Sequence, residues 1–252
     1  MKDFSTFSRL HNNTDPLIIA NVWDAGSALF FEANGFKAVA TSSLALAHSM
    51  GYKDGQDLPF ETLLAAAKNI YDKVSIPLSV DIERGYGETD AAILKNIEKL
   101  SDAGIAGINI EDGLPGGGLS DINSFQRTIG AIAEQASKEK SIFIHVRTDA
   151  YLQKDPGAFD KTMERIKAYE AAGASGIFIP YLVDVEEMKQ ITAAVKIPVS
   201  VFFCKPLPAF KDLAAAGIKR VSMGSGFYKY VYNAMQHAVS KIKEDGSAIS
   251  LF

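Results

Sequence analysis

Eight short apolar runs recur along the chain, and a longer amphipathic segment follows each of them. The runs are rich in Ile and Val, and most are bounded by Gly or Pro, as buried parallel strands are. Strands are predicted at residues 17–22, 37–42, 77–81, 107–110, 141–147, 176–180, 198–202 and 219–223. Alternation of strands with helices over one continuous chain predicts an α/β fold, a closed (β/α)8 TIM barrel. A doubly wound open sheet is the alternative.

The segments between the strands predict helices at 61–73, 90–103, 122–139, 159–172, 185–195 and 226–244. Four helices are expected to end in a left-handed glycine that leads into the next strand, at Gly35, Gly104, Gly173 and Gly217. The segment 226–244 would be the eighth helix, with apolar residues at helical spacing, and its simplest interpretation is a helix packed on its own barrel. No linker or low-complexity tract interrupts residues 1–252, so a single domain is expected.

Composition excludes several classes of protein. The chain has 252 residues, which suits one barrel. Its formal net charge of −4, without a basic cluster, argues against nucleic-acid binding. No apolar run is long enough for a membrane helix, and residues 1–10 lack the apolar core of a signal peptide. Cys204 is the only cysteine, so a reducing, cytoplasmic location is expected.

Polar side chains gather where three neighbouring strands end. Strand alternation places Asp81 and Glu83 on one face, Asn109 and Glu111 on the next strand, and His145, Arg147 and Asp149 on the one after. Apolar neighbours must face the outer helices, so this polar set points into the barrel mouth, where active sites of such barrels lie. Crowded carboxylates repel unless a cation joins them, and hard oxygen ligands favour Mg2+ or Mn2+. The alternative is that the acids bond to loop amides and to Arg84.

Two further features belong to the same mouth. Arg147 could clamp a substrate carboxylate, or it could neutralise the acids. The loop after the fourth strand carries Gly113, Gly116, Gly117 and Gly118, which favours a mobile lid. A phosphate-cradling loop and a plain surface turn are the alternatives.

The motifs, in their order along the chain, resemble the isocitrate lyase/phosphoenolpyruvate mutase superfamily over about residues 15–230. The most specific element is Asp81-Ile82-Glu83-Arg84-Gly85-Tyr86-Gly87, spaced before Glu111-Asp112 and Arg147-Thr148-Asp149. Upstream, the resemblance includes Asn21-Val22-Trp23-Asp24-Ala25, Thr41-Ser42-Ser43-Leu44 and Gly51-Tyr52-Lys53-Asp54.

The resemblance implies roles for individual residues. Asp81 would contact Mg2+ directly, while Glu83 and Glu111 would hold its waters. Trp23, Ser42, Ser43 and Leu44 would bind the oxo acid, Asp54 would lie beside the reacting group, and Arg147 would bind or polarise the substrate. The family barrel exchanges its eighth helix between subunits, so a homodimer or homotetramer is implied.

The departures from the family pattern limit what can be carried over. Isocitrate and methylisocitrate lyases of this family have a catalytic cysteine in the lid, which here is Gly-Leu-Pro-Gly-Gly-Gly. Cys204 instead falls on the seventh strand as a predicted core thiol. The lysine and asparagine of the phosphoenolpyruvate mutase lid are missing too. His48, expected on the second βα loop, could act as acid or base, and His145 could orient a carboxylate. His11 and His237 lie outside the predicted mouth and are expected at the surface or at an interface.

The residues and the resemblance together predict a Mg2+-dependent carbon–carbon lyase. It would act on a small 2-oxo or 2-hydroxy acid and form an enolate. A P–C bond enzyme acting on phosphonopyruvate or a carboxyphosphonate is the enzymatic alternative. A non-catalytic, acid-binding oligomeric scaffold is the alternative from another class.

Overall fold

The computed structural model describes residues 2–138 and 141–249, which form a closed barrel of eight parallel strands. Each strand pairs with its neighbours in sequence, and β1 closes the barrel by pairing with β8. The (β/α)8 prediction is therefore confirmed. The strands are β1 Leu17–Val22, β2 Val39–Thr41, β3 Leu78–Asp81, β4 Gly107–Glu111, β5 Phe143–Arg147, β6 Gly176–Phe178, β7 Val199–Phe202 and β8 Arg220–Ser222.

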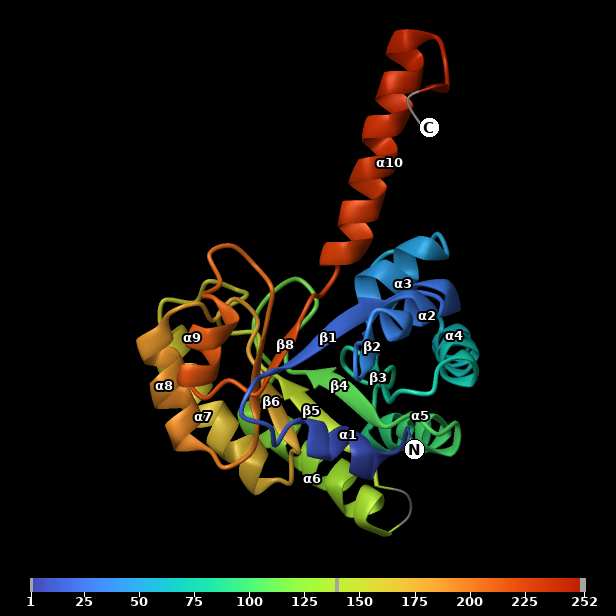
Figure 1. The fold of residues 1–252 in the computed structure, drawn as a ribbon. Helices are drawn as coiled ribbons and strands as arrows, with labels where there is room; N and C mark the ends of the chain where they lie inside the picture. Colours follow the sequence, from blue (N-terminus) through green and yellow to red (C-terminus); the bar gives the residue numbers. More distant parts are fainter. Residues whose placement is uncertain (1, 139–140, 250–252) are drawn as a thin grey trace.

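Helices surround the barrel (Figure 1). They are α1 Phe4–Leu10, α2 Ala25–Ala33, α3 Ser43–Ser49, α4 Phe60–Lys73, α5 Asp90–Asp102, α6 Ile122–Lys138, α7 Ala158–Ala171, α8 Val185–Ala194, α9 Phe210–Ala215 and α10 Gly226–Asp245. The six helices predicted by range start and end within a residue of their predicted bounds where the structure describes them. Two helices, α1 and α3, were not predicted, because each is only seven residues long and too short for a helical period.

The glycine turns adopt the expected left-handed conformation. Gly35, Gly104, Gly173 and Gly217 have φ angles of 84°, 86°, 101° and 83°. At Gly104 a side chain is also excluded by space, because a Cβ atom would lie 2.5 Å from the ring of Tyr71. These turns let each helix reverse directly into the next strand.

Two apolar regions hold the barrel together. Outward-facing strand residues such as Val80, Ile108 and Val146 are fully buried against the helices. A smaller cluster fills the lower barrel interior, where Phe7 of α1 closes the amino-terminal end against Phe143. The barrel is therefore plugged from below, and its interior opens only toward the carboxyl ends of the strands.

The helix α10 departs from the simplest expectation. It projects away from the barrel instead of packing on it (Figure 1). Of its residues only Tyr228 is buried, while Val231, Tyr232, Met235 and Val239 are 41–47% exposed. The interpretation of a helix packed on its own barrel is therefore wrong, because the chain leaves β8 in a direction that carries α10 off the surface.

Three smaller expectations are corrected. His48 lies in helix α3, not in a loop, because Ser42 caps a helical run of Leu and Ala. Cys204 lies in the loop after β7 and is partly exposed, so it is not a core thiol. His11 is only 2% exposed and stacks on Phe143, with ring centroids 4.4 Å apart, because α1 folds under the barrel.

No helix in the described part of the chain has the length and apolar character needed to cross a membrane.

Candidate active site

A cavity of about 270 Å³ opens at the carboxyl ends of the strands, where the sequence places the polar set. Its rim is formed by the strand ends that carry Asp81 and Arg147, by loops and by the start of α10. Its floor is formed by inward-facing strand residues that lie deeper in the barrel, among them Ser79, Asn109 and Arg220. Its lining includes Asn21, Ala40, Thr41, Ser42, Ser43, Leu44, Asp54, Ser79, Asp81, Asn109, Arg147, Phe178, Tyr181, Phe202, Arg220, Ser222 and Lys229. Most of the predicted substrate and metal residues therefore meet in one place.

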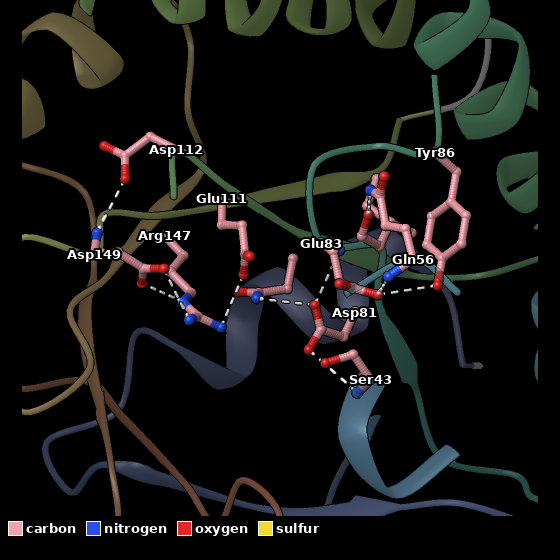
Figure 2. Close-up of polar contacts among 11 residues, drawn as sticks. Ser43, Gln56, Asp81, Glu83, Tyr86, Glu111, Asp112, Arg147 and Asp149 are labelled. Atoms are coloured by element: carbon pink, nitrogen blue, oxygen red, sulfur yellow. Dashed lines mark hydrogen bonds and ion pairs between the residues drawn. The ribbon is translucent and has the colours of Figure 1, made fainter. Parts of the chain in front are cut away.

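Asp81 lies at the end of β3 and lines this cavity. Its backbone N–H donates to Thr41 Oγ1 at 2.9 Å, which ties β3 to β2. From the described residues its carboxylate accepts only long hydrogen bonds, at 3.2 Å from Glu83 N, 3.4 Å from Ser43 N and 3.5 Å from Asn109 Nδ2 (Figure 2). These weak contacts leave the carboxylate with unused coordination capacity.

Glu83 follows β3 in a left-handed backbone conformation, with φ 49°, and its side chain contacts the loop after α3. Its Oε1 accepts from Gln56 N at 3.0 Å and from Tyr86 OH at 3.1 Å. Burial, and then the charges of Asp81 and Asp54, raise the pKa of Glu83 to about 7. The alternative of acids bonded to backbone amides therefore holds for one oxygen of Glu83, and, through longer contacts with Glu83 N and Ser43 N, for Asp81.

Arg84 does not neutralise the acids. Its guanidinium donates to Gly55 O at 3.5 Å, in the loop that follows α3. The alternative that assigned Arg84 to the acid cluster is therefore wrong, because its side chain turns out to the exposed side of that loop.

Arg147, at the end of β5, bridges two carboxylates. Nη1 contacts Glu111 Oε2 at 2.8 Å, while Nε and Nη2 donate to Asp149 at 2.5 and 3.0 Å (Figure 2). Although burial by itself would lower the pKa of Arg147, Glu111 and Asp149 raise it. Burial, opposed by Arg147, raises the pKa of Glu111. All three guanidinium nitrogens therefore contact carboxylates of the protein, which favours the role of neutralising the acids over that of clamping a substrate carboxylate.

The glycine-rich loop is anchored at both ends. Asp112 at its start accepts from Asp149 N, Arg165 Nη1 and Tyr169 OH at 2.7–3.0 Å. At its other end Gln153 exchanges two hydrogen bonds with the backbone of Gly118. The loop residues Gly113, Gly116, Gly117 and Gly118 do not line the cavity. A lid role for them stays a prediction.

The predicted substrate residues form one wall. Ser42 caps α3, and Ser43 and Leu44 in its first turn line the cavity beside Asp54. Partial burial, and then the charge of Asp81, raise the pKa of Asp54, while the Ser43 hydroxyl opposes this shift by donating to it. Asp54 is thus a carboxyl group near Asp81 that binds a proton more readily than an ordinary aspartate does.

Five predicted catalytic, substrate and metal residues do not line the cavity: Glu83 and Glu111, described above, and Trp23, His48 and His145. Trp23 and His48 both contact Tyr228 at the start of α10, with ring centroids 5.2 and 6.5 Å from it. His145 lies deeper in the barrel, fully buried, where its Nε2 shares a 2.6 Å hydrogen bond with Ser200 Oγ. Burial lowers the pKa of His145 well below its usual value, so its ring is neutral.

Sequence reasoning missed two cations that line the cavity. Lys229 belongs to the first turns of α10, which were assigned to packing and not to the site. Arg220 on β8 is 3% exposed, and burial lowers its pKa to about 9, a shift that Asp81 opposes. The alternation of β8, with Arg220 and Ser222 on either side of the outward Val221, could have identified Arg220.

The donor set fits a divalent cation that is held mostly through water. Within residues 2–138 and 141–249, no three His, Cys, Asp or Glu side chains come close enough to bind an ion jointly. Asp81 nevertheless presents a carboxylate with spare capacity, and burial, followed by the charge of Asp81, raises the pKa values of Glu83 and Asp54. Mg2+ commonly keeps several waters and takes one or two direct carboxylates, which suits this arrangement.

Comparison with known proteins identifies the class of enzyme. Residues 7–243 match the family model described as phosphoenolpyruvate phosphomutase. An uncharacterised protein of Mycobacterium tuberculosis is 31% identical over 95% of this chain and 89% of its own length. The 2-methylisocitrate lyase of Escherichia coli is 25% identical over 94% of this chain and 83% of its own length. Other curated relatives are oxaloacetate decarboxylases and a phosphoenolpyruvate phosphomutase.

A solved structure agrees with these matches. A Burkholderia cenocepacia protein with a provisional phosphonomutase assignment superimposes with a TM-score of 0.88 at 33% identity, covering 96% of this chain and all of its own. The chain therefore belongs to the phosphoenolpyruvate phosphomutase family of the isocitrate lyase/phosphoenolpyruvate mutase superfamily. The predicted family is confirmed, and so is the prediction of an enzyme, since curated members are lyases and mutases.

Proposed function

We propose that this enzyme is a Mg2+-dependent lyase that cleaves the C–C bond next to the carbonyl of a small 2-oxo or 2-hydroxy acid. The observation that carries the proposal is the Asp81 carboxylate, which lines the cavity, makes only long hydrogen bonds to the described residues and interacts through its charge with Glu83, Glu111 and Asp54. The sequence relationship to 2-methylisocitrate lyases and oxaloacetate decarboxylases supports C–C chemistry.

The residues divide the work of such a reaction. Ser42 and the first turn of α3 would hold the substrate carboxylate and carbonyl beside Asp81. Arg147 would place positive charge at the edge of the same space and keep Glu111 in position. Bound Mg2+ would stabilise the negative charge that develops on the substrate oxygen when the bond breaks.

Asp54 is the candidate for proton transfer. Its carboxyl lies beside Ser43 and Asp81, and its pKa is raised toward neutral pH. An acid–base group works best when its pKa is close to the pH of the reaction. It would deliver a proton to the enolate carbon, or remove one from the hydroxyl of a 2-hydroxy acid. Without a lid cysteine, Asp54 is the carboxyl group that lines the cavity together with Asp81 and is free to serve as the acid–base group.

A turnover screen tests this function. Oxaloacetate, 2-methylisocitrate and other 2-oxo and 2-hydroxy acids would be assayed with Mg2+, with Mn2+ and with EDTA. We expect C–C cleavage that EDTA abolishes and either metal restores. Full activity after rigorous metal removal would contradict the metal role, and an absence of C–C cleavage on every acid would contradict the lyase.

A P–C bond enzyme is the second candidate, supported by the family model and by the phosphonomutase-like structure. It is less favoured, because the lid carries glycines where a mutase of this family has lysine and asparagine. Phosphonopyruvate belongs in the same screen, and preferential turnover of it would select this candidate.

We also propose that α10 is exchanged between subunits of a homodimer or homotetramer. A helix with five apolar or aromatic residues that are 41–73% exposed needs a partner surface to be stable in water, and these are Tyr230, Val231, Tyr232, Met235 and Val239. Light scattering tests the assembly: the wild type should be oligomeric, and Val231→Glu with Met235→Glu should dissociate it. A monomeric wild type would contradict the proposal.

A further inference from the structure

The floor of the cavity holds a buried cation that the protein does not pair. Arg220 extends from β8, where it lies in register with Leu17 and Ser200. Its residue is 3% exposed, and its Nε and Nη1 have no hydrogen-bond partner in the described part of the chain. Below it, the ring of Phe7 lies 5.8 Å from the guanidinium carbon. The charge is thus sealed from beneath and open only to the cavity.

The other buried arginines of the molecule behave differently. Arg147 contacts Glu111 and Asp149, and Arg165 donates to Asp112, Tyr169 and the backbone of Ser120. An unpaired buried guanidinium is costly, and replacing such a charge by an apolar side chain is often neutral or stabilising. Packing alone therefore gives no reason for arginine at position 220, whereas an anionic ligand would.

Other polar groups on the floor of the cavity also lack hydrogen-bond partners among the described residues. Ser79 Oγ and Asn109 Oδ1 are buried, line the cavity and lack hydrogen-bond partners in the described chain. Ala40, the small residue paired with Ser79 on the neighbouring strand β2, also lines the cavity. His145 and His11, the titratable groups nearest from below, are neutral, since burial lowers the pKa of each. The floor thus offers donors from Arg220 and Ser79, and one acceptor suited to a water or a ligand hydroxyl.

We propose that Arg220 binds the second carboxylate of a short dicarboxylic acid whose oxo or hydroxy acid end lies beside Asp81. Ser79 stands one inward position below Asp81 on β3, which separates the two levels by about 6–7 Å. A diacid reaching down the barrel axis would place one carboxylate at each level. The inference rests on the proposed function only for the position of the oxo or hydroxy acid end.

Calorimetry with matched acids tests this specificity. In the presence of Mg2+, 2-oxoglutarate would be compared with 2-oxopentanoate, and malate with 2-hydroxybutyrate, so that each pair differs by one carboxylate. We expect the wild type to bind the diacid about 10- to 100-fold more tightly in at least one pair, as a charge-assisted hydrogen bond implies. Arg220→Met should abolish that preference.

The same variant also separates a ligand site from a structural role. Without ligand, Arg220→Met should melt at the wild-type temperature or above it, whereas the control Arg165→Met should melt lower and keep the diacid preference. A large fall in the melting temperature of Arg220→Met would overturn the proposal. So would equal binding within both pairs, failure of all four acids to bind, or a preference retained by the variant. None of these binding results predicts a loss of turnover in the screen described above. The proposed lyase function is therefore tested separately from the role of Arg220.

Discussion

The rim and the floor of the cavity each contain a buried arginine, and the two are treated in opposite ways. Arg147 at the rim has its nitrogens committed to Glu111 and Asp149. Arg220 at the floor has two nitrogens without partners. The rim is thus held in place by contacts within the protein, while the floor keeps its binding capacity for something else.

This difference has an energetic meaning. A paired buried charge loses stability when either partner is removed, because the other is left uncompensated. An unpaired buried charge already carries that cost, so its removal relieves the fold. The rim should therefore be sensitive to mutation in both stability and activity, and the floor mainly in ligand discrimination.

The largest effect is expected at Asp54. If this rim carboxyl transfers a proton in the reaction, Asp54→Ala should lower kcat by about 100-fold or more and leave KM nearly unchanged. Steady-state kinetics with a substrate from the screen measures both, with Asp57→Ala in the same loop as the control. A near-normal kcat would remove Asp54 from the mechanism and weaken the distinction between a catalytic rim and a binding floor.

Substitutions of the rim acids Asp81 and Glu83 should lower metal affinity by different amounts. Asp81→Asn removes a carboxylate that lines the cavity and makes only long hydrogen bonds to the described residues, whereas Glu83→Gln changes a group already bonded to Gln56 and Tyr86. Loss of a group that acts through water typically weakens metal binding by about 10- to 100-fold, and loss of the direct ligand should exceed that. Mn2+ titration of both variants, followed by electron paramagnetic resonance, gives the ranking. Equal affinities would contradict the assignment of Asp81 as the direct ligand.

Arg147→Lys sharpens the contrast between the two arginines. Lysine keeps the charge but cannot serve Glu111 and both oxygens of Asp149 at once. The free energy of unfolding should fall by about 1–3 kcal/mol, as expected for lost charge-assisted hydrogen bonds in a buried site. Urea denaturation measures this, beside Arg220→Met as the comparison. An unchanged stability would mean that the rim contacts contribute little.

The smallest effect concerns the glycine-rich loop. Gln153→Ala deletes the two hydrogen bonds to Gly118, so amide exchange at Gly118 should quicken by about tenfold, with the barrel strands unchanged. Hydrogen exchange with and without a substrate analogue would also test the lid: protection should rise on binding. Equal protection in both states would exclude a closing loop.

Much of the fold could be predicted because its signals are local. The eight apolar runs, their spacing and the glycines at helix ends each depend on a few consecutive residues. The alternation of β3, β4 and β5 also assigned Asp81, Glu111 and Arg147 to the barrel interior, since side-chain direction in a strand repeats every two residues. The short helices α1 and α3 escaped prediction, and with them the burial of His11 and the helical position of His48.

The amino-acid sequence by itself determined the order of elements, the family and the faces that point inward. Only the tertiary structure decided which inward groups meet. Strand period places Arg147 and Arg220 alike inside the barrel, yet Arg147 forms an ion pair with Glu111 across the β4–β5 pairing, whereas Arg220 forms none within the described residues and feels Asp81 only through its charge. Whether α10 packs or projects was undecided for the same reason. Pairing depends on distances between segments that lie far apart in the chain, and a local periodicity carries no information about them.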